Sequence, residues 1–166
     1  MRQLVIENTI INDNSDCFVI AEVGHNHQGS VETAKQIFDK AKEAGANAVK
    51  LQKRDNKQLF TKEMYDSHYD SKNAYGDTYG AHRDALEFGM EEYVELQQYA
   101  KELGLILFAT PFDLPSVDFL EKLDMPLYKI ASGDLKSTPL LKYVAKTGKP
   151  VIVSTGGGEM DDVRRA

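Results

Sequence analysis

The sequence predicts an α/β protein built around a parallel β-sheet. Five short apolar runs rich in Val, Ile, Leu and Phe have the composition of strands buried on both faces: residues 18–22, 48–52, 106–110, 127–130 and 151–154. Segments with the 3.6-residue period of amphipathic helices lie between them, and each helix leads into the next strand within a few residues. This alternation predicts right-handed βαβ units, and it fits both a closed barrel and an open sheet.

Each expected helix is bounded by a recognisable start or stop. The first helix follows the N-cap candidate Ser30, carries its apolar residues at helical spacing, and ends at Gly45. A further helix is expected to begin near Glu159. Three more helices are expected between the first helix and the one near Glu159. Each is followed by a residue that favours helix termination: Gly104, Pro126 and Gly148.

Two segments depart from the repeating pattern. Residues 4–11, with the turn-like sequence NDNSD after them, could form a hairpin that closes the bottom of a barrel. About forty residues separate Gln52 from the helix near Glu91, far more than a usual βα connection, and such insertions are typically functional or disordered. The insertion is rich in Tyr, Gly, Asp and His. It could be a lid over the substrate or a merely solvated loop, and we favour the lid.

Composition limits the function classes. The 166 residues, 42% of them hydrophobic, suit one domain, numbered 1–166, whereas a complete (β/α)8 barrel needs roughly 250 residues. A net charge of −6 without a Lys/Arg cluster argues against a nucleic-acid surface. Cys17 is the only cysteine, which favours a reducing compartment. With no signal peptide or long apolar run apparent, we expect a cytoplasmic protein that does not enter a membrane.

Polar residues suited to binding or chemistry follow each of the five expected strands. The downstream ends of parallel strands open onto one face, where α/β enzymes place their active sites. The residues concerned are Glu22, Lys50, Gln52, Thr110, Lys129, Ser132 and Ser154. The sequence therefore predicts a pocket at this end of the sheet.

The two lysines indicate an acidic ligand. A buried ammonium on a strand is costly unless it meets an anion, which a substrate phosphate or carboxylate would supply to Lys129 and, with less force, to Lys50. A Schiff-base lysine and a lysine that only extends its charge to solvent are the alternatives. The Ser132-Gly133 pair and the Gly-rich stretch after Ser154 could direct backbone N–H groups at a phosphate, although no established phosphate-loop motif is present.

Glu22 and the histidines each have two interpretations. Glu22 is either an acid or base with a pKa tuned by its surroundings, or the partner of Lys50 in a structural ion pair. His25 and His27 are spaced so that both could bind a metal, but two ligands do not make a site, and hydrogen bonding to the backbone is favoured. His68 and His82, inside the insertion, have no interpretation by themselves.

Several motifs, taken together and in order, resemble the sialic acid synthase (N-acetylneuraminate synthase) family. They are AEVGHNHQG from residue 21, VKLQ from 49, YGAHR from 79, LEF from 86, FATPF from 108, YKIASGD from 128 and VSTGG from 153. The resemblance runs from about residue 3 to the end of the chain. It implies a transferase of carbohydrate biosynthesis on a (β/α)8 TIM-type barrel, of which this chain covers about the first five βα units. It also implies that the later strands and a C-terminal antifreeze-like domain lie outside residues 1–166.

The resemblance implies a reaction and site roles as well. Phosphoenolpyruvate condenses with an N-acylated amino sugar such as N-acetylmannosamine to give a nonulosonic (sialic) acid and phosphate. Lys50, Thr110, Lys129, Ser132 and Ser154 would hold phosphoenolpyruvate, Gln52 would face the sugar, and Glu22 would be catalytic. A divalent metal, Mn²⁺ or Mg²⁺, would have its ligands outside this chain, and the complete enzyme would be a homodimer. Gly156–Gly158 departs from the family pattern, which expects a bulkier residue after the first Gly.

Two other functions remain open. A related synthase that joins phosphoenolpyruvate to an aldose, making a 3-deoxy sugar acid, would share the βα arrangement, and product analysis would distinguish it. An inactive fragment that serves only as a binding module is the second alternative, supported by the absence of the implied metal ligands from residues 1–166.

Overall fold

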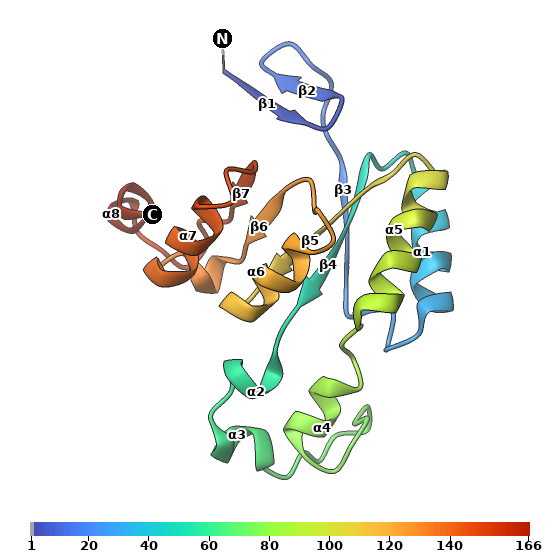
Figure 1. Cartoon of the computed structure of the whole chain (residues 1–166), viewed down its shortest axis with the longest axis vertical. Coiled ribbons are helices and arrows are strands. Elements are labelled where there is room, and N and C mark those ends of the chain that lie inside the picture. The colour runs from blue at the N-terminus through green and yellow to red at the C-terminus, as the bar shows by residue number, and fades with distance from the viewer. Residues whose placement is uncertain (1) are drawn as a thin grey trace.

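The computed structural model describes residues 2–166 and contains a parallel sheet of five strands in the order β3-β4-β5-β6-β7 (Figure 1). The strands are Ile20–Gly24, Ala48–Lys53, Ile106–Pro111, Tyr128–Ile130 and Val151–Val153. Every strand expected from the sequence is present, and each lies beside its predecessor in the chain. The prediction of an α/β fold with a parallel sheet is confirmed.

The expected helices are also present. They are α1 (Val31–Glu43), α5 (Met90–Glu102), α6 (Leu114–Glu121), α7 (Thr138–Ala145) and α8 (Met160–Arg165). The Ser30 side chain accepts a hydrogen bond from the Thr33 N–H, as its N-cap assignment predicted, and Gly45 ends α1 with a φ of 83°. Within residues 2–166, no helix has the length and apolar character needed to cross a bilayer.

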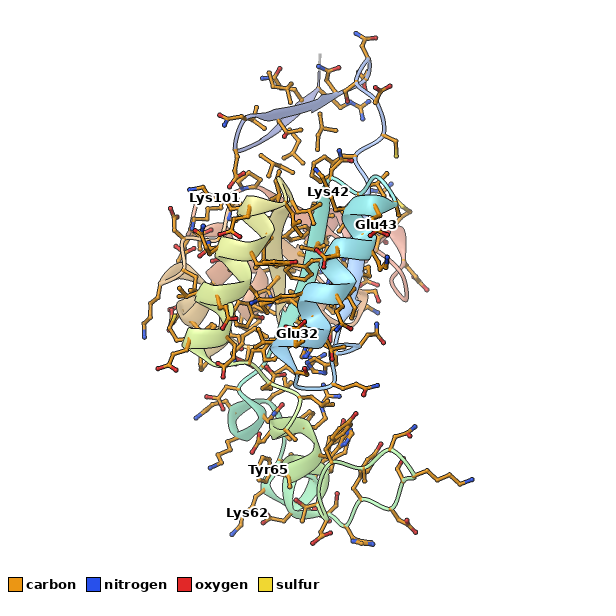
Figure 2. The ribbon with its side chains drawn as sticks, turned by 90° about the vertical axis from the view of Figure 1, so that its right-hand side faces the viewer. Glu32, Lys42, Glu43, Lys62, Tyr65 and Lys101 are labelled. Carbon is orange, nitrogen blue, oxygen red and sulfur yellow. The ribbon has the colours of Figure 1, made fainter. Side chains whose placement is uncertain are left out.

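The main core lies between the helices and one face of the sheet. Strand residues such as Val49, Leu107 and Tyr128 belong to one apolar cluster with Phe38 of α1 and Leu96 of α5. Helices α1 and α5 lie side by side against the sheet in Figure 2. The strands are in sequential order and the helices of this cluster cover one face of the sheet, whereas an open doubly wound sheet carries helices on both faces.

A hairpin lies at the upstream end of the sheet. It consists of β1 (Gln3–Ile6) and β2 (Thr9–Asn12), paired antiparallel. Its Ile6 is fully buried in a second apolar cluster with Ala48, Phe108 and Leu127. The expected hairpin is therefore confirmed, but it reverses direction at Glu7, which has a φ of 51°, and the NDNSD sequence begins at the last residue of β2.

The long insertion between β4 and α5 is folded. It contains the short helices α2 (Asn56–Leu59), α3 (Lys62–Asp66) and α4 (Tyr79–Asp84), and the rings of Tyr69, Tyr79 and His82 pack together within it. Figure 1 shows the insertion beyond the downstream end of β4, at the opposite end of the sheet from the hairpin. The insertion is thus a structured unit beside the face on which the polar residues were expected.

Candidate active site

The face of the sheet opposite the helices has an apolar half and a polar half. Its upstream residues form the cluster capped by the hairpin, including Ala48, Phe108 and Leu127. Two positions further along the same strands stand Lys50, Thr110 and Lys129, because alternate residues of a strand share a face. The expected meeting of polar side chains at the downstream strand ends is therefore present in the structure.

Lys50 lies at the centre of this polar row. Its side chain is 4% exposed, and its ammonium is 2.8 Å from a carboxylate oxygen of Glu22 and 2.9 Å from the Thr110 hydroxyl. The ammonium also donates to the Leu51 carbonyl at 3.5 Å. The register explains the contact with Glu22, since Glu22 and Lys50 are directly opposite in the β3–β4 pair. Three oxygens therefore match the three donors of this buried ammonium.

Lys129 has a different environment. Its ammonium donates to the Ile130 carbonyl at 2.8 Å and to the Ser154 hydroxyl. Within residues 2–166, no carboxylate lies within ion-pair distance of it. Burial lowers the pKa of Lys129, and the nearby charge of Lys50 lowers it further, while Glu22 opposes both effects. Lys129 is partly buried, which is less burial than its position on a strand suggested. The oxygens that contact its ammonium are all neutral.

Glu22 differs from its expected environment. Its side chain is 59% exposed, whereas the apolar residues before it suggested a desolvated carboxylate. The downstream end of β3, an edge strand of this sheet, leaves the carboxylate open to solvent on the face that carries Lys50. The ion pair with Lys50 is present, and the exposure also leaves the carboxylate accessible to a ligand.

The two serines occupy adjoining turns. Ser154 follows β7 and accepts from Lys129, while Ser132 begins the 3₁₀ turn η1 (Ser132–Asp134) after β6. A Cβ placed on Gly156 would lie 3.5 Å from the Ser132 Cβ, so the Gly-rich turn passes close to this serine. Ser132 is exposed and Ser154 half-buried, which places both hydroxyls at the open rim of the site.

Gln52 belongs to a second, partly buried polar cluster. Its Oε1 accepts from Arg54 Nη2 at 2.8 Å. The Arg54 guanidinium lies 3.7 Å from the centre of the Phe112 ring and 3.8 Å from Glu87 Oε1. Burial opposes ionisation of Glu87, but the adjacent His25 ring, the charge of Lys53 and a hydrogen bond from the Arg54 backbone N–H hold the pKa of Glu87 below its ordinary value. An ionised Glu87 therefore anchors the cations of this cluster.

Sequence reasoning missed Arg54 and Glu87 as members of the site. They are 33 residues apart, Arg54 after β4 and Glu87 near the end of the insertion, and no periodic pattern relates them. The LEF motif that contains Glu87 was the available signal. Asp134 was also missed. Burial raises the pKa of its carboxyl, against the influence of Arg54.

The two neighbouring histidines have separate structural roles. His27 is buried, its Nδ1 accepts from the Gly29 N–H at 3.1 Å, and its ring stacks on Phe88 at 4.0 Å. The favoured interpretation, a histidine bonded to the backbone, is correct for His27. His25 instead places Nε2 3.2 Å from Glu87 Oε1. With His82 and Tyr75 of the insertion, it lines a hollow of about 460 Å³.

The part of the chain that the structure describes brings together no group of three His, Cys, Asp or Glu side chains able to hold a metal ion. The described side chains therefore do not form a divalent-metal site by themselves.

Comparison with known proteins identifies the family. The NeuB family model matches residues 37–166. N-acetylneuraminate-9-phosphate synthase of Mus musculus is 41% identical over 90% of this chain and 42% of its own length. N,N'-diacetyllegionaminic acid synthase of Legionella pneumophila is 38% identical over 90% of this chain and 42% of its own. This chain thus spans less than half the length of these relatives.

A solved structure agrees with these matches. The N-acetylneuraminic acid (sialic acid) synthetase of Leptospira borgpetersenii, crystallised with citrate, superimposes with a TM-score of 0.83 at 30% identity, over 99% of this chain and 53% of that one. The fold, the order of the motifs and the family match lead to one conclusion: this chain belongs to the NeuB family of sialic acid synthases.

Proposed function

We propose that this chain supplies the phosphoenolpyruvate-binding part of a synthase that condenses phosphoenolpyruvate with an N-acylated amino sugar to give a nonulosonic acid and phosphate. The observation that carries the proposal is the pair of lysines, Lys50 and Lys129, on the face of the sheet opposite the helices, beside the Thr110 and Ser154 hydroxyls. Phosphoenolpyruvate carries a phosphate and a carboxylate, so two cations among neutral donors match its charge distribution.

Lys129 is the first candidate partner for an anionic oxygen, because only neutral oxygens contact it. Lys50 is already paired with Glu22, so an incoming anion would share Lys50 with Glu22 or displace its carboxylate. The exposure of Glu22 permits that movement. Ser132 and Ser154 lie on the turns where their hydroxyls and the neighbouring N–H groups would complete the anion site.

The proposed reaction is the one that the family resemblance implies. Carbon 3 of phosphoenolpyruvate attacks the sugar aldehyde, the aldehyde oxygen takes a proton, water adds at carbon 2, and phosphate leaves with cleavage of the C–O bond. Glu22 would orient that water or accept its proton, and the lysines would offset the charge at the two ends of phosphoenolpyruvate. Gln52, two residues after Lys50 on β4, would contact the sugar.

The complete protein is proposed to be a (β/α)8 barrel in which residues 1–166 form the first part of one catalytic domain. The sequential strand order and the one-sided helix layer support this. A divalent metal, Mn²⁺ or Mg²⁺, is proposed to bind through residues outside this chain, where it would polarise the aldehyde. A homodimer in the cytoplasm is proposed on the family resemblance alone.

The sugar is proposed to be N-acetylmannosamine or its 6-phosphate. Three carbons from phosphoenolpyruvate added at carbon 1 turn carbon 6 of the sugar into carbon 9 of the product, so a 9-phosphate product requires a 6-phosphate substrate. The name of the mouse relative refers to the phosphorylated product, and that of the Legionella relative refers to a different nonulosonic acid.

The test is product analysis with the complete protein. Phosphoenolpyruvate and Mn²⁺ are supplied with N-acetylmannosamine, its 6-phosphate, or the aldose phosphates used by 3-deoxy sugar acid synthases. Phosphoenolpyruvate labelled with ¹⁸O in the bridging position should deliver the label to phosphate, and mass spectrometry should detect a nine-carbon acid. A product from the aldose phosphates alone would contradict the proposal.

The placement of the metal has a test of its own. The 166-residue chain is first checked by circular dichroism to establish that it is folded. It should then form no sialic acid from N-acetylmannosamine, phosphoenolpyruvate and Mn²⁺. Robust turnover would mean that the metal ligands lie within residues 1–166, with His25 the first candidate.

A further inference from the structure

The contact between Arg54 and Gln52 fixes the orientation of the Gln52 amide. A guanidinium has only donors, so the Gln52 atom that faces Arg54 Nη2 at 2.8 Å must be the carbonyl oxygen. The amide nitrogen then points to the other side, where a Cβ on Gly24 would be 3.6 Å away. The two N–H donors of Gln52 are thus the groups left for a ligand.

Arg54 is held on several sides. Its side chain is 10% exposed, its guanidinium lies over the Phe112 ring, and Glu87 is within ion-pair distance. Its Nη1 lies 3.2 Å from His25 Nε2. A guanidinium confined in this way is not free to reach out to a substrate, although it can hold a neighbour in place.

We propose that Arg54 is a positioning residue that presents the Gln52 amide to the substrate as a hydrogen-bond donor. The sugar group that Gln52 contacts would then be an acceptor, a carbonyl or hydroxyl oxygen, and a group that only donates would be rejected. This inference rests on the proposed function, because Gln52 faces the same side of the sheet as the proposed phosphoenolpyruvate site.

Two substitutions at Gln52 test the direction of the hydrogen bond. Gln52→Glu keeps an oxygen for Arg54 and removes both N–H donors, while Gln52→Leu removes donor and acceptor together. Both should raise the KM for N-acetylmannosamine by about fivefold or more, in the range for losing one hydrogen bond, and leave the KM for phosphoenolpyruvate within about twofold. A Gln52→Glu enzyme with the wild-type sugar KM would overturn the inference.

A double-mutant cycle tests whether Arg54 acts through Gln52. Arg54→Met alone should raise the sugar KM, Arg54→Lys should restore part of the loss, and Arg54→Met should add nothing once Gln52 is Leu. If the effects of Arg54→Met and Gln52→Leu on the sugar KM multiply in the double variant, Arg54 does not act through Gln52. Arg164→Met is the matched control, because Arg164 is an exposed arginine in α8 paired with Asp161.

A measurement without turnover separates this inference from the proposed function. The side-chain amide signals of Gln52 in the ¹⁵N NMR spectrum should shift in Arg54→Met and stay in place in Arg164→Met. Unchanged signals in Arg54→Met would overturn the inference even in an active enzyme. If phosphoenolpyruvate shows no binding to the wild-type protein by calorimetry, the proposed function fails, whatever the NMR spectra show.

Discussion

The buried ammonium of Lys50 lies 2.8 Å from the carboxylate of Glu22, although the two side chains differ widely in exposure, at 4% and 59%. A buried cation is thus neutralised by an anion that remains open to solvent. Such a pair stabilises Lys50 without locking Glu22, so one carboxylate can serve both a structural and a chemical role.

The Glu22→Gln variant separates these two roles. The amide keeps the size of the carboxylate and an oxygen for Lys50 but loses basicity. We expect kcat to fall by about 10²–10⁴ while phosphoenolpyruvate affinity survives. Melting temperature and kcat are measured on one preparation of the complete protein. A destabilised but fully active variant would leave Glu22 only its structural role.

Lys129→Met tests the proposed anion site. Removing the cation that only neutral oxygens contact should cost about 2–4 kcal/mol in kcat/KM, the range for losing one partner of a buried charge pair. Steady-state kinetics with phosphoenolpyruvate as the varied substrate measures it. Lys35→Met, which breaks the exposed pair with Glu95 between α1 and α5, should keep kcat/KM near wild type. A folded, fully active Lys129→Met enzyme would contradict the assignment.

His27 should make stability depend on pH. Burial lowers its pKa to about 4 from 6.5, with His25 adding to the effect and Glu87 and the Gly24 backbone opposing it. As pH falls, the unfolded chain binds a proton at this histidine before the folded protein does. The contribution of neutral His27 to the free energy of unfolding is therefore fully present above about pH 6.5 and declines towards pH 4, by at most about 3 kcal/mol.

Urea unfolding at pH 7, 5.5 and 4.5 measures this decline. His27→Asn is the control, because an amide oxygen can still accept the Gly29 N–H but does not titrate in this range. The difference in stability between the wild type and His27→Asn should shrink as pH falls. A difference that does not change with pH would remove His27 as the cause.

Gly29 and Gly45 form a matched pair for testing a close backbone contact. Both have positive φ, 76° and 83°, but a Cβ on Gly29 would lie 2.3 Å from the Ala85 carbonyl oxygen, whereas at Gly45 nothing lies within 4 Å. Gly45→Ala should cost about 1 kcal/mol from backbone strain alone. Gly29→Ala should cost a further 1–3 kcal/mol, roughly, because the insertion must shift. If denaturant unfolding gives the same loss of stability for both variants, the insertion can move away from a Cβ at position 29 without measurable cost.

The sequence alone determined the local elements and the polar ends of the strands. Alternation places Lys50 and Gln52 on one face of β4, and the caps at Ser30 and Gly45 bound α1, because period and capping depend on neighbours in the chain. The positions of polar residues at the downstream ends of β4 and β5 also predicted that Lys50 and Thr110 would lie close together.

Only the tertiary structure decided which partners these residues have. Arg54 meets Glu87 across the insertion, and Glu22 is exposed although apolar residues precede it. Neither relationship has a period or a spacing that sequence reasoning could use. Both depend on how far a strand extends past its neighbour and where a long connection returns, which packing of the whole chain determines.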